Sequence, residues 1–407
     1  MGIYTEYIEK RLSPEGLVAA RKEQLCRIAA LRNSAVLVYA ADYTSQFKAQ
    51  RAPMALDASD LVPITDQLDN LQGNSVDVIL ETPGGNGTVA EDIVRMLRHK
   101  FEKVSFIIPG QAKSAGTIMA MSGDEILMDF RSAVGPIDAQ INFEGKQFSA
   151  EALLKGIDKI VATAEKEGKL NRAYIPILQR LSPGDIQNAE NALDFARVLV
   201  RDWLCQYKFK DWHVHRTHNV GSPVTVEQKK ARAQEVADAL CDHSNWLSHG
   251  RSIRMKDLTG LGLEIVDFAT QLELADAIGR YYALLRISFD TSPIFKLIET
   301  PTSQINRVIQ MQQQQAGVLP FLQAAAPGQI AQGPTGTMGT LIGAECPQCR
   351  HVTNIQADFD VEHPLQPNAV RFPSNNVIIC SKCKAANALG DLKQRLEMQA
   401  SRKVFTK

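Results

Sequence analysis

The chain has 407 residues, of which 44% are hydrophobic and 22% charged, so it can bury a sizeable core and is not globally disordered. Lys and Arg together number 45, as do Asp and Glu, which argues against a protein that mainly binds nucleic acid or acidic membranes non-specifically. No apolar run approaches the roughly 18–20 residues that cross a bilayer, and residues 1–11 lack the apolar centre of a secretory signal. We therefore expect a soluble, cytoplasmic protein of two to three domains.

The first third of the chain alternates between helix and strand patterns. Ser13 supplies a capping hydroxyl and Pro14 suits a first helical turn, so a helix is expected to begin there. The predicted elements, helices and strands together, are 13–31, 35–41, 58–71, 76–81, 92–101, 104–108, 115–122 and 126–128. Such alternation is typical of βαβ units and indicates an α/β fold with a largely parallel sheet.

The rest of the chain has a different organisation. Apolar residues recur with a helical period after residue 149, and the predicted helices are 150–166, 186–207, 226–241 and 272–286. Val308 to Ala344 contains no charged residue and is rich in Gln, Gly, Ala and Pro, which is typical of a flexible linker. The expected divisions are an N-terminal helical segment 1–34, a main domain 35–290, a linker 291–343, a compact cysteine module 344–391 and a charged tail 392–407.

A glycine-rich segment, Glu81-Thr82-Pro83-Gly84-Gly85-Asn86-Gly87, directly follows the second predicted strand. Glycine lets a backbone amide face a ligand with no side chain in the way. The segment is not GxGxxG and no GK[ST] follows it, so a phosphate cradle has little support. An ordinary glycine-rich turn is the alternative interpretation.

A serine lies at the next strand-to-helix junction, within Pro109-Gly110-Gln111-Ala112-Lys113-Ser114-Ala115-Gly116-Thr117. The partial positive charge of a helix N-terminus favours an alkoxide or oxyanion there. The backbone amides of Gly85 and Ala115 could bracket the oxyanion of a tetrahedral intermediate. A plain helix cap is the other interpretation of Ser114.

Three motifs in this order resemble the Clp-fold serine proteases: Thr82-Pro83-Gly84-Gly85, Lys113-Ser114-Ala115-Gly116-Thr117 and Val134-Gly135-Pro136-Ile137-Asp138. The best resemblance is to the serine dehydrogenase proteinase group, related to signal peptide peptidase A and the archaeal stomatin-cleaving protease. It covers residues 35–165 well, 166–290 loosely, and neither the linker nor the cysteine module. The resemblance implies a ClpP/crotonase-like spiral of ββα units with a helical C-terminal extension, Ser114 as nucleophile, and Gly85 and Ala115 as oxyanion-hole donors.

The general base does not follow the Clp pattern. Clp peptidases use a histidine about 25 residues after the serine, where this chain reads Ile137-Asp138-Ala139-Gln140. The membrane-protease relatives instead use a lysine early in the following helix. Alignment of Gly135 with the corresponding glycine of those relatives implies that Lys155 is the base.

A base lysine must satisfy a physical condition. Its pKa has to fall from about 10.4 to about 7–8, normally through desolvation. Glu151 and Asp158 share the helical face of Lys155, and their negative charges would stabilise its protonated form. A solvated surface lysine is therefore the alternative to a general base. Lys113 and Lys146 are further candidates for the base.

Other polar residues have less specific signals. Asp138 falls near the Clp histidine position, where it could orient the lysine, hold a substrate amine or form a turn. His213, His215 and His218 resemble a metal site only loosely, and a polar loop or surface strand is favoured. His249 precedes a predicted helix–turn–strand element, which could also bring this histidine into the site.

Four cysteines near the C-terminus form two CxxC pairs that are separated by 30 residues. Two such turns present four thiolates, which is the donor set of a closed, structural Zn²⁺ site. The predicted ligands of this zinc ribbon are Cys346, Cys349, Cys380 and Cys383. Redox-active pairs are the alternative.

The cysteine module is only mildly basic. Residues 344–407 contain nine Lys or Arg and six Asp or Glu, with few aromatic residues for stacking on bases. Nucleic acid is therefore disfavoured as a ligand, and a docked protein partner or a delivered substrate fits the module better.

The sequence thus predicts a serine peptidase that acts through a Ser114–Lys155 dyad and an acyl-enzyme. One alternative is a crotonase-like enzyme that uses the oxyanion hole on CoA thioesters, and another is a non-catalytic oligomeric scaffold. The Clp resemblance implies a homo-oligomer that acts on protein or peptide substrates. The ATPase signature GxxxxGK[ST] does not occur in the chain, so any ATP-driven unfolding of protein substrates would require a partner protein.

Overall fold

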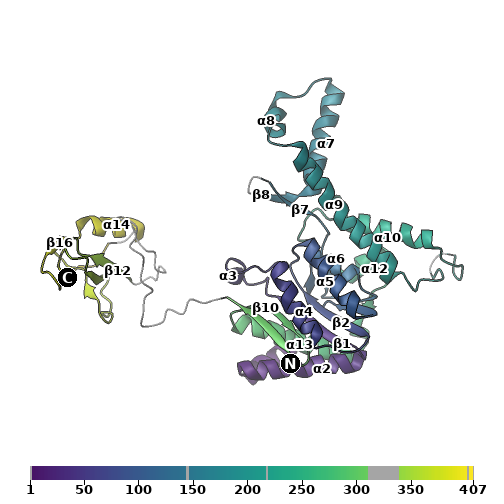
Figure 1. Cartoon of the computed structure of the whole chain (residues 1–407), viewed down its shortest axis with the longest axis horizontal. Coiled ribbons are helices and arrows are strands. Elements are labelled where there is room, and N and C mark those ends of the chain that lie inside the picture. Colours follow the sequence, from purple (N-terminus) through teal and green to yellow (C-terminus); the bar gives the residue numbers. More distant parts are fainter. Residues whose placement is uncertain (1, 144–145, 217–218, 310–338, 401–402, 407) are drawn as a thin grey trace. The chain divides into compact units, whose positions relative to one another are not determined.

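The computed structural model describes residues 2–143, 146–216, 219–309, 339–400 and 403–406 (Figure 1). The chain divides into two compact units, Met1–Gln313 and Gln314–Lys407. The first unit is built on a seven-stranded sheet of order β11-β10-β1-β2-β3-β5-β9. Its strands are β1 (Ala35–Ala41), β2 (Ser75–Glu81), β3 (Lys103–Ile107), β5 (Glu125–Met128), β9 (Val266–Asp267), β10 (Ile294–Glu299) and β11 (Gln304–Val308).

The neighbouring strands β1, β2, β3, β5 and β9 are parallel, whereas β10 and β11 extend the sheet antiparallel. Two short pairs accompany the sheet: β4 (Gln111–Ala112) with β6 (Ala133–Val134), and β7 (Gln140–Phe143) with β8 (Lys146–Ser149). The helices of this unit are α1 (Ile3–Lys10), α2 (Pro14–Arg32), α3 (Gln46–Ala49), α4 (Leu61–Asp69), α5 (Gly87–Lys100), α6 (Ala115–Met121), α7 (Ala150–Glu167), α8 (Ile175–Leu178), α9 (Pro183–Trp203), α10 (Val226–Cys241), α11 (His243–Trp246), α12 (Met255–Gly260) and α13 (Leu272–Thr291).

Both faces of the sheet are covered, as parallel strands require. Val36 and Val38 of β1 point into a core shared with α2 and α13, whereas Leu37 and Tyr39 point into the core beneath α4 and α5. Figure 1 shows α2 and α13 on one side of the sheet and α4, α5 and α6 on the other. This layering leaves the carboxyl ends of the parallel strands to form the candidate site.

The first four predicted strands and the helices around them are confirmed to within a few residues. The largest shift is in α5, which begins at Gly87 rather than at residue 92. Asn86 explains the early start because its side chain accepts the Thr88 N–H at 2.9 Å and caps the helix.

The predicted linker from residue 291 begins too early, because residues 294–308 form β10 and β11. β10 pairs with β1, placing Glu299 opposite Val38. The sequence pattern does not indicate this strand because it contains two charged residues that are fully buried. Lys296 Nζ lies 2.7 Å from Asp60, and Glu299 lies 3.0 Å from Arg21. The main domain therefore extends past residue 290, while predicted linker residues 310–338 lie outside the described ranges.

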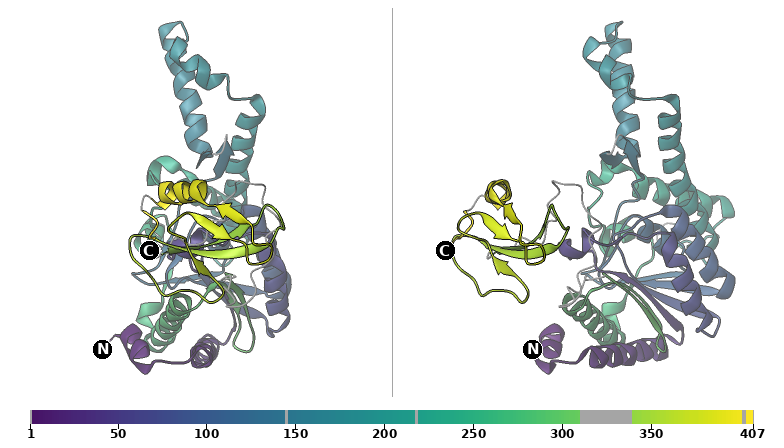
Figure 2. Two further views of the ribbon diagram at one scale, coloured as in Figure 1. Left: turned by 90° about the vertical axis from the view of Figure 1, so that its left-hand side faces the viewer. Right: turned by 60° about the vertical axis from the view of Figure 1, so that its left-hand side comes forward.

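A helical arm extends from the first unit. It follows the β7–β8 hairpin, which the sequence pattern did not indicate, and consists of α7, α8 and α9. Figures 1 and 2 agree that the arm projects away from the sheet. The arm matters for the site because Lys155 lies near the base of α7.

The second unit is a small β module. Its elements are β12 (Gly339–Glu345), β13 (Val352–Asp358), β14 (Val370–Arg371), β15 (Val377–Ile379), β16 (Ala386–Ala388) and α14 (Gly390–Ala400). Ile355, Phe372 and Leu396 belong to its core. The predicted charged tail from residue 392 is therefore part of this module, since Leu396 of α14 is buried.

Candidate active site and metal centre

Ser114 occupies a strained backbone turn immediately before α6. Its φ of 49° and ψ of −113° are rarely adopted by a residue with a side chain. The turn is held by hydrogen bonds from Gly116 N–H to the Lys113 carbonyl and from Ile118 N–H to the Ser114 carbonyl. Within the described part of the chain the Ser114 hydroxyl has no hydrogen-bond partner, so it is available to a ligand.

The glycine-rich loop packs directly against this turn. Thr82 N–H donates to the Gln111 carbonyl at 2.9 Å, and Lys113 N–H donates to the Thr82 carbonyl at 3.0 Å. A Cβ on Gly84 would lie 2.6 Å from Ser114 Cβ and 3.3 Å from the Ala115 nitrogen. The two motifs that the sequence singles out therefore meet at the carboxyl ends of β2 and β3.

Gly85 is held from its other side by Leu56. Leu56 N–H donates to the Gly84 carbonyl at 2.7 Å, and Asn86 N–H donates to the Leu56 carbonyl at 2.9 Å. A Cβ on Gly85 would lie 2.4 Å from the Leu56 nitrogen and oxygen, so a glycine is required here. Among the described residues, the amides of Gly85 and Ala115 donate to no partner. Two free donors thus lie beside the serine, which is the chemistry of an oxyanion hole.

Lys155 lies on a half-exposed face of α7, where its ammonium forms ion pairs with Glu151 and Asp242. Its ammonium contacts Glu151 and lies 3.2 Å from Asp242. The hydrogen bond to Glu151, followed by that to Asp242, raises the pKa of Lys155 above its ordinary value. This is the opposite of what a general base needs at neutral pH, so the role of Lys155 stays a prediction.

Asp138 is buried and forms a small polar cluster with three neighbours. Its carboxylate accepts from Ser149 Oγ at 2.5 Å and from Gln140 Nε2 at 2.9 Å. His249 Nδ1 lies 3.7 Å from Asp138 Oδ2. His249 is thus among the side chains that the structure brings to Asp138, which the sequence left as one of two possibilities.

The approach of His249 depends on a pairing that is remote in sequence. Val134 and Ile253 exchange backbone hydrogen bonds as an isolated antiparallel bridge, which brings the segment that contains His249 alongside the segment that leads to Asp138. Lys113 stabilises this pairing: its ammonium donates to the Val134 and Arg251 carbonyls and to Ser252 Oγ. No local signal could have predicted such a contact.

The other lysine candidates differ in their surroundings. Burial, and then the charge of Arg254, lowers the pKa of Lys113 to about 8. Its Nζ nevertheless has three acceptors at 3.0–3.2 Å, which indicates a structural role. Lys146 lies in β8.

His213 and His215, which follow Trp212, lie in a loop. Val214 pairs with Pro223, and the His215 ring contacts Trp212 edge-on with centroids 5.5 Å apart. His218 lies outside the described residues.

The four predicted zinc ligands do converge. The Sγ atoms of Cys346, Cys349, Cys380 and Cys383 all lie within 4.8 Å of one another. A tetrahedral site with Zn–S bonds of about 2.3 Å has sulfurs about 3.8 Å apart. Backbone N–H groups of Cys349 and Gln348 lower the pKa of Cys346 to about 6, and that of Cys383 lowers the pKa of Cys380. The cluster can therefore bind a metal ion.

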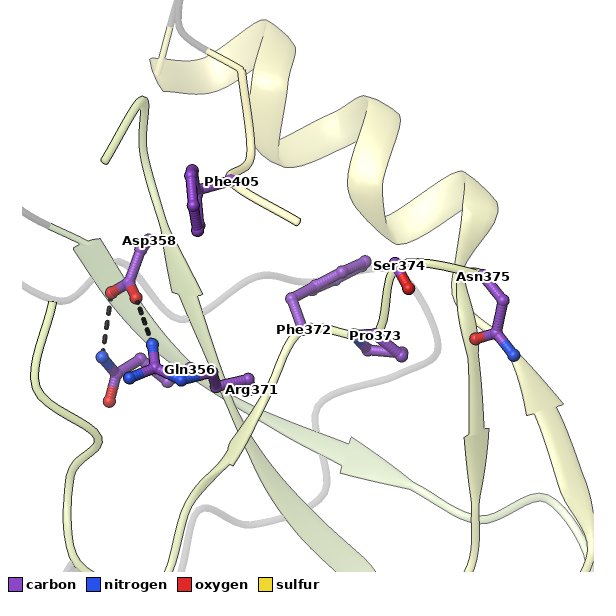
Figure 3. A pocket seen from close by; sticks show the side chains of 8 residues that line it. All are labelled: Gln356, Asp358, Arg371, Phe372, Pro373, Ser374, Asn375 and Phe405. Atoms are coloured by element: carbon purple, nitrogen blue, oxygen red, sulfur yellow. Dashed lines mark hydrogen bonds and ion pairs between the residues drawn. The ribbon is translucent and has the colours of Figure 1, made fainter. Parts of the chain in front are cut away.

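The same unit has a hollow of about 330 Å³ between β13, β14 and the C-terminal segment (Figure 3). On one side, Asp358 accepts from Gln356 Nε2 at 2.9 Å and from Arg371 Nη1 at 3.1 Å. The side chains of Phe372 and Phe405 also line the hollow. Asp358, Gln356 and Arg371 pair with one another, and the hollow by itself points to no particular ligand.

Comparison with known families agrees with this geometry. Residues 8–175 match the family of ClpP-like serine proteinases of the SDH type. The predicted resemblance to this group is thereby confirmed for the part of the chain that contains Ser114 and both glycine motifs. The matched part of the first unit has the ClpP-like fold, and the clustered cysteines of the second unit can form the metal site of a zinc ribbon.

Two curated relatives are uncharacterised proteins of Methanocaldococcus jannaschii. One is 27% identical and the other 38% identical, each over 164 residues, which is 40% of this chain. The match covers 53% of the first relative and 51% of the second, so the chain spans about half the length of each.

Solved structures of ClpP-like proteases are also similar to this chain. A mutant of the 1510-N membrane-bound stomatin-specific protease has 14% identity and a TM-score of 0.30, over 54% of this chain and 80% of that one. The ClpP catalytic domain from Plasmodium falciparum has 13% identity and a TM-score of 0.27, over 54% and 87%. No helix in the described ranges is long and apolar enough to cross a membrane.

Proposed function

We propose that this protein is a serine peptidase whose nucleophile is Ser114. The observation that carries the proposal is the strained Ser114 turn packed against Gly84, with the unpaired amides of Gly85 and Ala115 beside it. Backbone strain of this kind is retained where it serves a function, and it exposes the hydroxyl as a nucleophile elbow does.

In the proposed reaction a base removes the Ser114 proton as Oγ attacks the carbonyl carbon of a peptide bond. The resulting oxyanion accepts hydrogen bonds from the Gly85 and Ala115 amides. The protonated base then gives its proton to the leaving amine, and the C–N bond breaks to leave an acyl-enzyme. Water, deprotonated by the same base, releases the acid and restores Ser114.

The base that the sequence predicts is Lys155. For this role its ammonium has to leave Glu151 and Asp242 and lose its proton, so the proposal includes a rearrangement at the base of α7. Asp138 would orient the base from its buried position.

We further propose that the four-cysteine cluster holds a structural Zn²⁺ and that this module recruits a protein partner or substrate. A closed set of four thiolates leaves no coordination position for catalysis, so zinc would stabilise the module alone. The ClpP-like fold is consistent with a homo-oligomer.

A fluorophosphonate probe, which reacts covalently with activated serines, tests the proposal. We expect it to label the full-length protein and to lose all labelling in Ser114→Ala. Ser13→Ala is the matched control, because Ser13 also lies at a helix N-terminus but its hydroxyl caps Gly16 N–H. Labelling of Ser13→Ala should equal that of the wild type.

Two results would favour the other functions. Folded wild-type protein that takes up no probe would contradict the peptidase and favour a scaffold. Thermal stabilisation by acyl-CoA without probe labelling would favour a crotonase-like enzyme.

A further inference from the structure

Glu81 is a buried carboxyl group that the proposed mechanism does not use. It is the last residue of β2, immediately before the glycine-rich loop, and its side chain is fully buried. Its carboxylate accepts from the Tyr43 hydroxyl at 2.7 Å, the Gln111 N–H at 2.9 Å and the Tyr282 hydroxyl at 3.2 Å. These three neutral donors come from three different parts of the chain.

The Gln111 hydrogen bond connects Glu81 to the serine turn. Glu81 accepts the Gln111 N–H, while the adjacent Thr82 N–H donates to the Gln111 carbonyl. The backbone N–H and the carbonyl of Gln111 are thus bonded to two consecutive residues, Glu81 and Thr82. Gln111 lies three residues before Ser114, so this double contact sets the position of the nucleophile relative to the loop of Gly84 and Gly85.

The carboxylate also packs closely against the backbone of Gly110. A Cβ on Gly110 would lie 2.5 Å and 2.6 Å from the two Glu81 oxygens and 2.4 Å from the Tyr282 hydroxyl. Residue 110 therefore packs directly against the ends of the Glu81 and Tyr282 side chains. A change in the carboxyl group is therefore transmitted to residues 110–114.

The charge of Glu81 determines how well it holds its donors. An ionised carboxylate is a charged acceptor for all three hydrogen bonds, two on Oε1 and that of Gln111 on Oε2. Protonation of Oε1 makes this oxygen a donor to a tyrosine hydroxyl and leaves Oε2 a neutral, weaker acceptor for the Gln111 N–H. Burial raises the pKa of Glu81 to about 7, against the hydrogen bonds from Tyr43, Gln111 and Tyr282 and the charge of Arg286. Those residues are the groups that face the carboxyl from β4, α13 and the segment after β1.

We propose that Glu81 is a positioning residue of this active site. Its carboxylate fixes the Ser114 turn against the loop of Gly84 and Gly85. Its protonation loosens this contact and slows the attack by Ser114. This inference rests on the proposed function, since it concerns the reactivity of the same serine.

The experiment compares the rate of fluorophosphonate labelling in the wild type and in Glu81→Gln between pH 5.5 and 8.5. Glutamine has nearly the same shape but stays neutral and accepts hydrogen bonds less strongly. At pH 8.5 we expect Glu81→Gln to react roughly fivefold more slowly, the difference between a charge-assisted and a neutral hydrogen bond. At pH 5.5 the two rates should converge, because the wild-type carboxyl is then also neutral.

Tyr282→Phe supplies a second variant that keeps the ring and removes one donor. The loss of a hydrogen bond to the ionised form should move the midpoint of the wild-type pH dependence upward. Tyr281→Phe is the matched control: Tyr281 is the preceding residue of α13, and its hydroxyl donates instead to the buried Glu299 at 2.8 Å. Its midpoint should equal that of the wild type.

The possible failures are distinguishable. If the wild type is labelled at Ser114 but the ratio of the two rates is the same at every pH, the role of Glu81 is wrong and the proposed function stands. If the wild type is not labelled at all, the proposed function itself fails. If Glu81→Gln does not fold, Tyr282→Phe and Tyr281→Phe test the inference instead. Equal midpoints in the pH dependence of labelling for these two variants would overturn it.

Discussion

Gly84 and Ser114, which are 30 residues apart in the sequence, are in backbone-to-side-chain contact: a Cβ on Gly84 would lie 2.6 Å from Ser114 Cβ. Gly84 also has a φ of +102°, which residues with a side chain rarely adopt. The close approach and the backbone conformation therefore both require glycine.

Gly84→Ala should consequently destabilise the protein and abolish labelling of Ser114. We expect a loss of about 2–4 kcal/mol in the free energy of unfolding, from overpacking and backbone strain together. Gly73→Ala is the control, because Gly73 has the same φ of +102° but a Cβ there would meet nothing within 4 Å, so this change should cost about 1 kcal/mol. Equal losses for the two variants, measured by urea unfolding, would contradict the contact.

The proposed role of Lys155 can be tested through Glu151. Because Glu151 is the main cause of the raised lysine pKa, Glu151→Gln should lower it and bring more of the amine into its neutral form. Labelling of Ser114 at pH 7 should then rise by about 3- to 10-fold, and Lys155→Ala should remove it.

Glu165→Gln, on an exposed turn of the same helix, is the control and should change nothing. Labelling that survives Lys155→Ala would contradict the dyad. His249→Gln would then test the histidine that lies opposite Asp138.

The raised pKa of Glu81 also predicts how the stability of the protein depends on pH. Its folded pKa of about 7 lies above the ordinary value of 4.5, so the protonated form is favoured by folding. The stabilisation is complete below pH 4.5 and is lost as the pH rises through 7. The free energy of unfolding of the wild type, relative to Glu81→Gln, should fall by up to about 3 kcal/mol over that range. A difference that stays constant with pH, measured by urea unfolding, would show that the carboxyl does not titrate there.

Metal removal should affect one unit alone. We expect one zinc per chain by elemental analysis, and its chelation should unfold the module around β12–β16 while the melting of the first unit stays unchanged. Cys383→Ser should lose the metal, whereas Cys26→Ser, at an exposed cysteine of α2, should keep it. Zinc binding that survives Cys383→Ser would contradict the four-cysteine site.

Much of the fold and part of the site can be predicted from the sequence because they depend on local patterns. Buried parallel strands are continuous apolar runs, and the motifs around Gly84 and Ser114 lie at strand ends. β10 was missed because its Lys296 and Glu299 are charged, and their burial depends on Asp60 and Arg21 far away in the chain. The contact of His249 with Asp138 depends in the same way on a pairing across more than 100 residues.

The pairing of Leu56 with the Gly84–Asn86 backbone has a consequence for regulation. The orientation of the Gly85 peptide plane is dictated by a neighbouring segment that contributes no reactive group. Proteolytic nicking, or a bound ligand that pulls residues 52–56 aside, would therefore disrupt the proposed oxyanion hole while leaving the Ser114 side chain chemically intact.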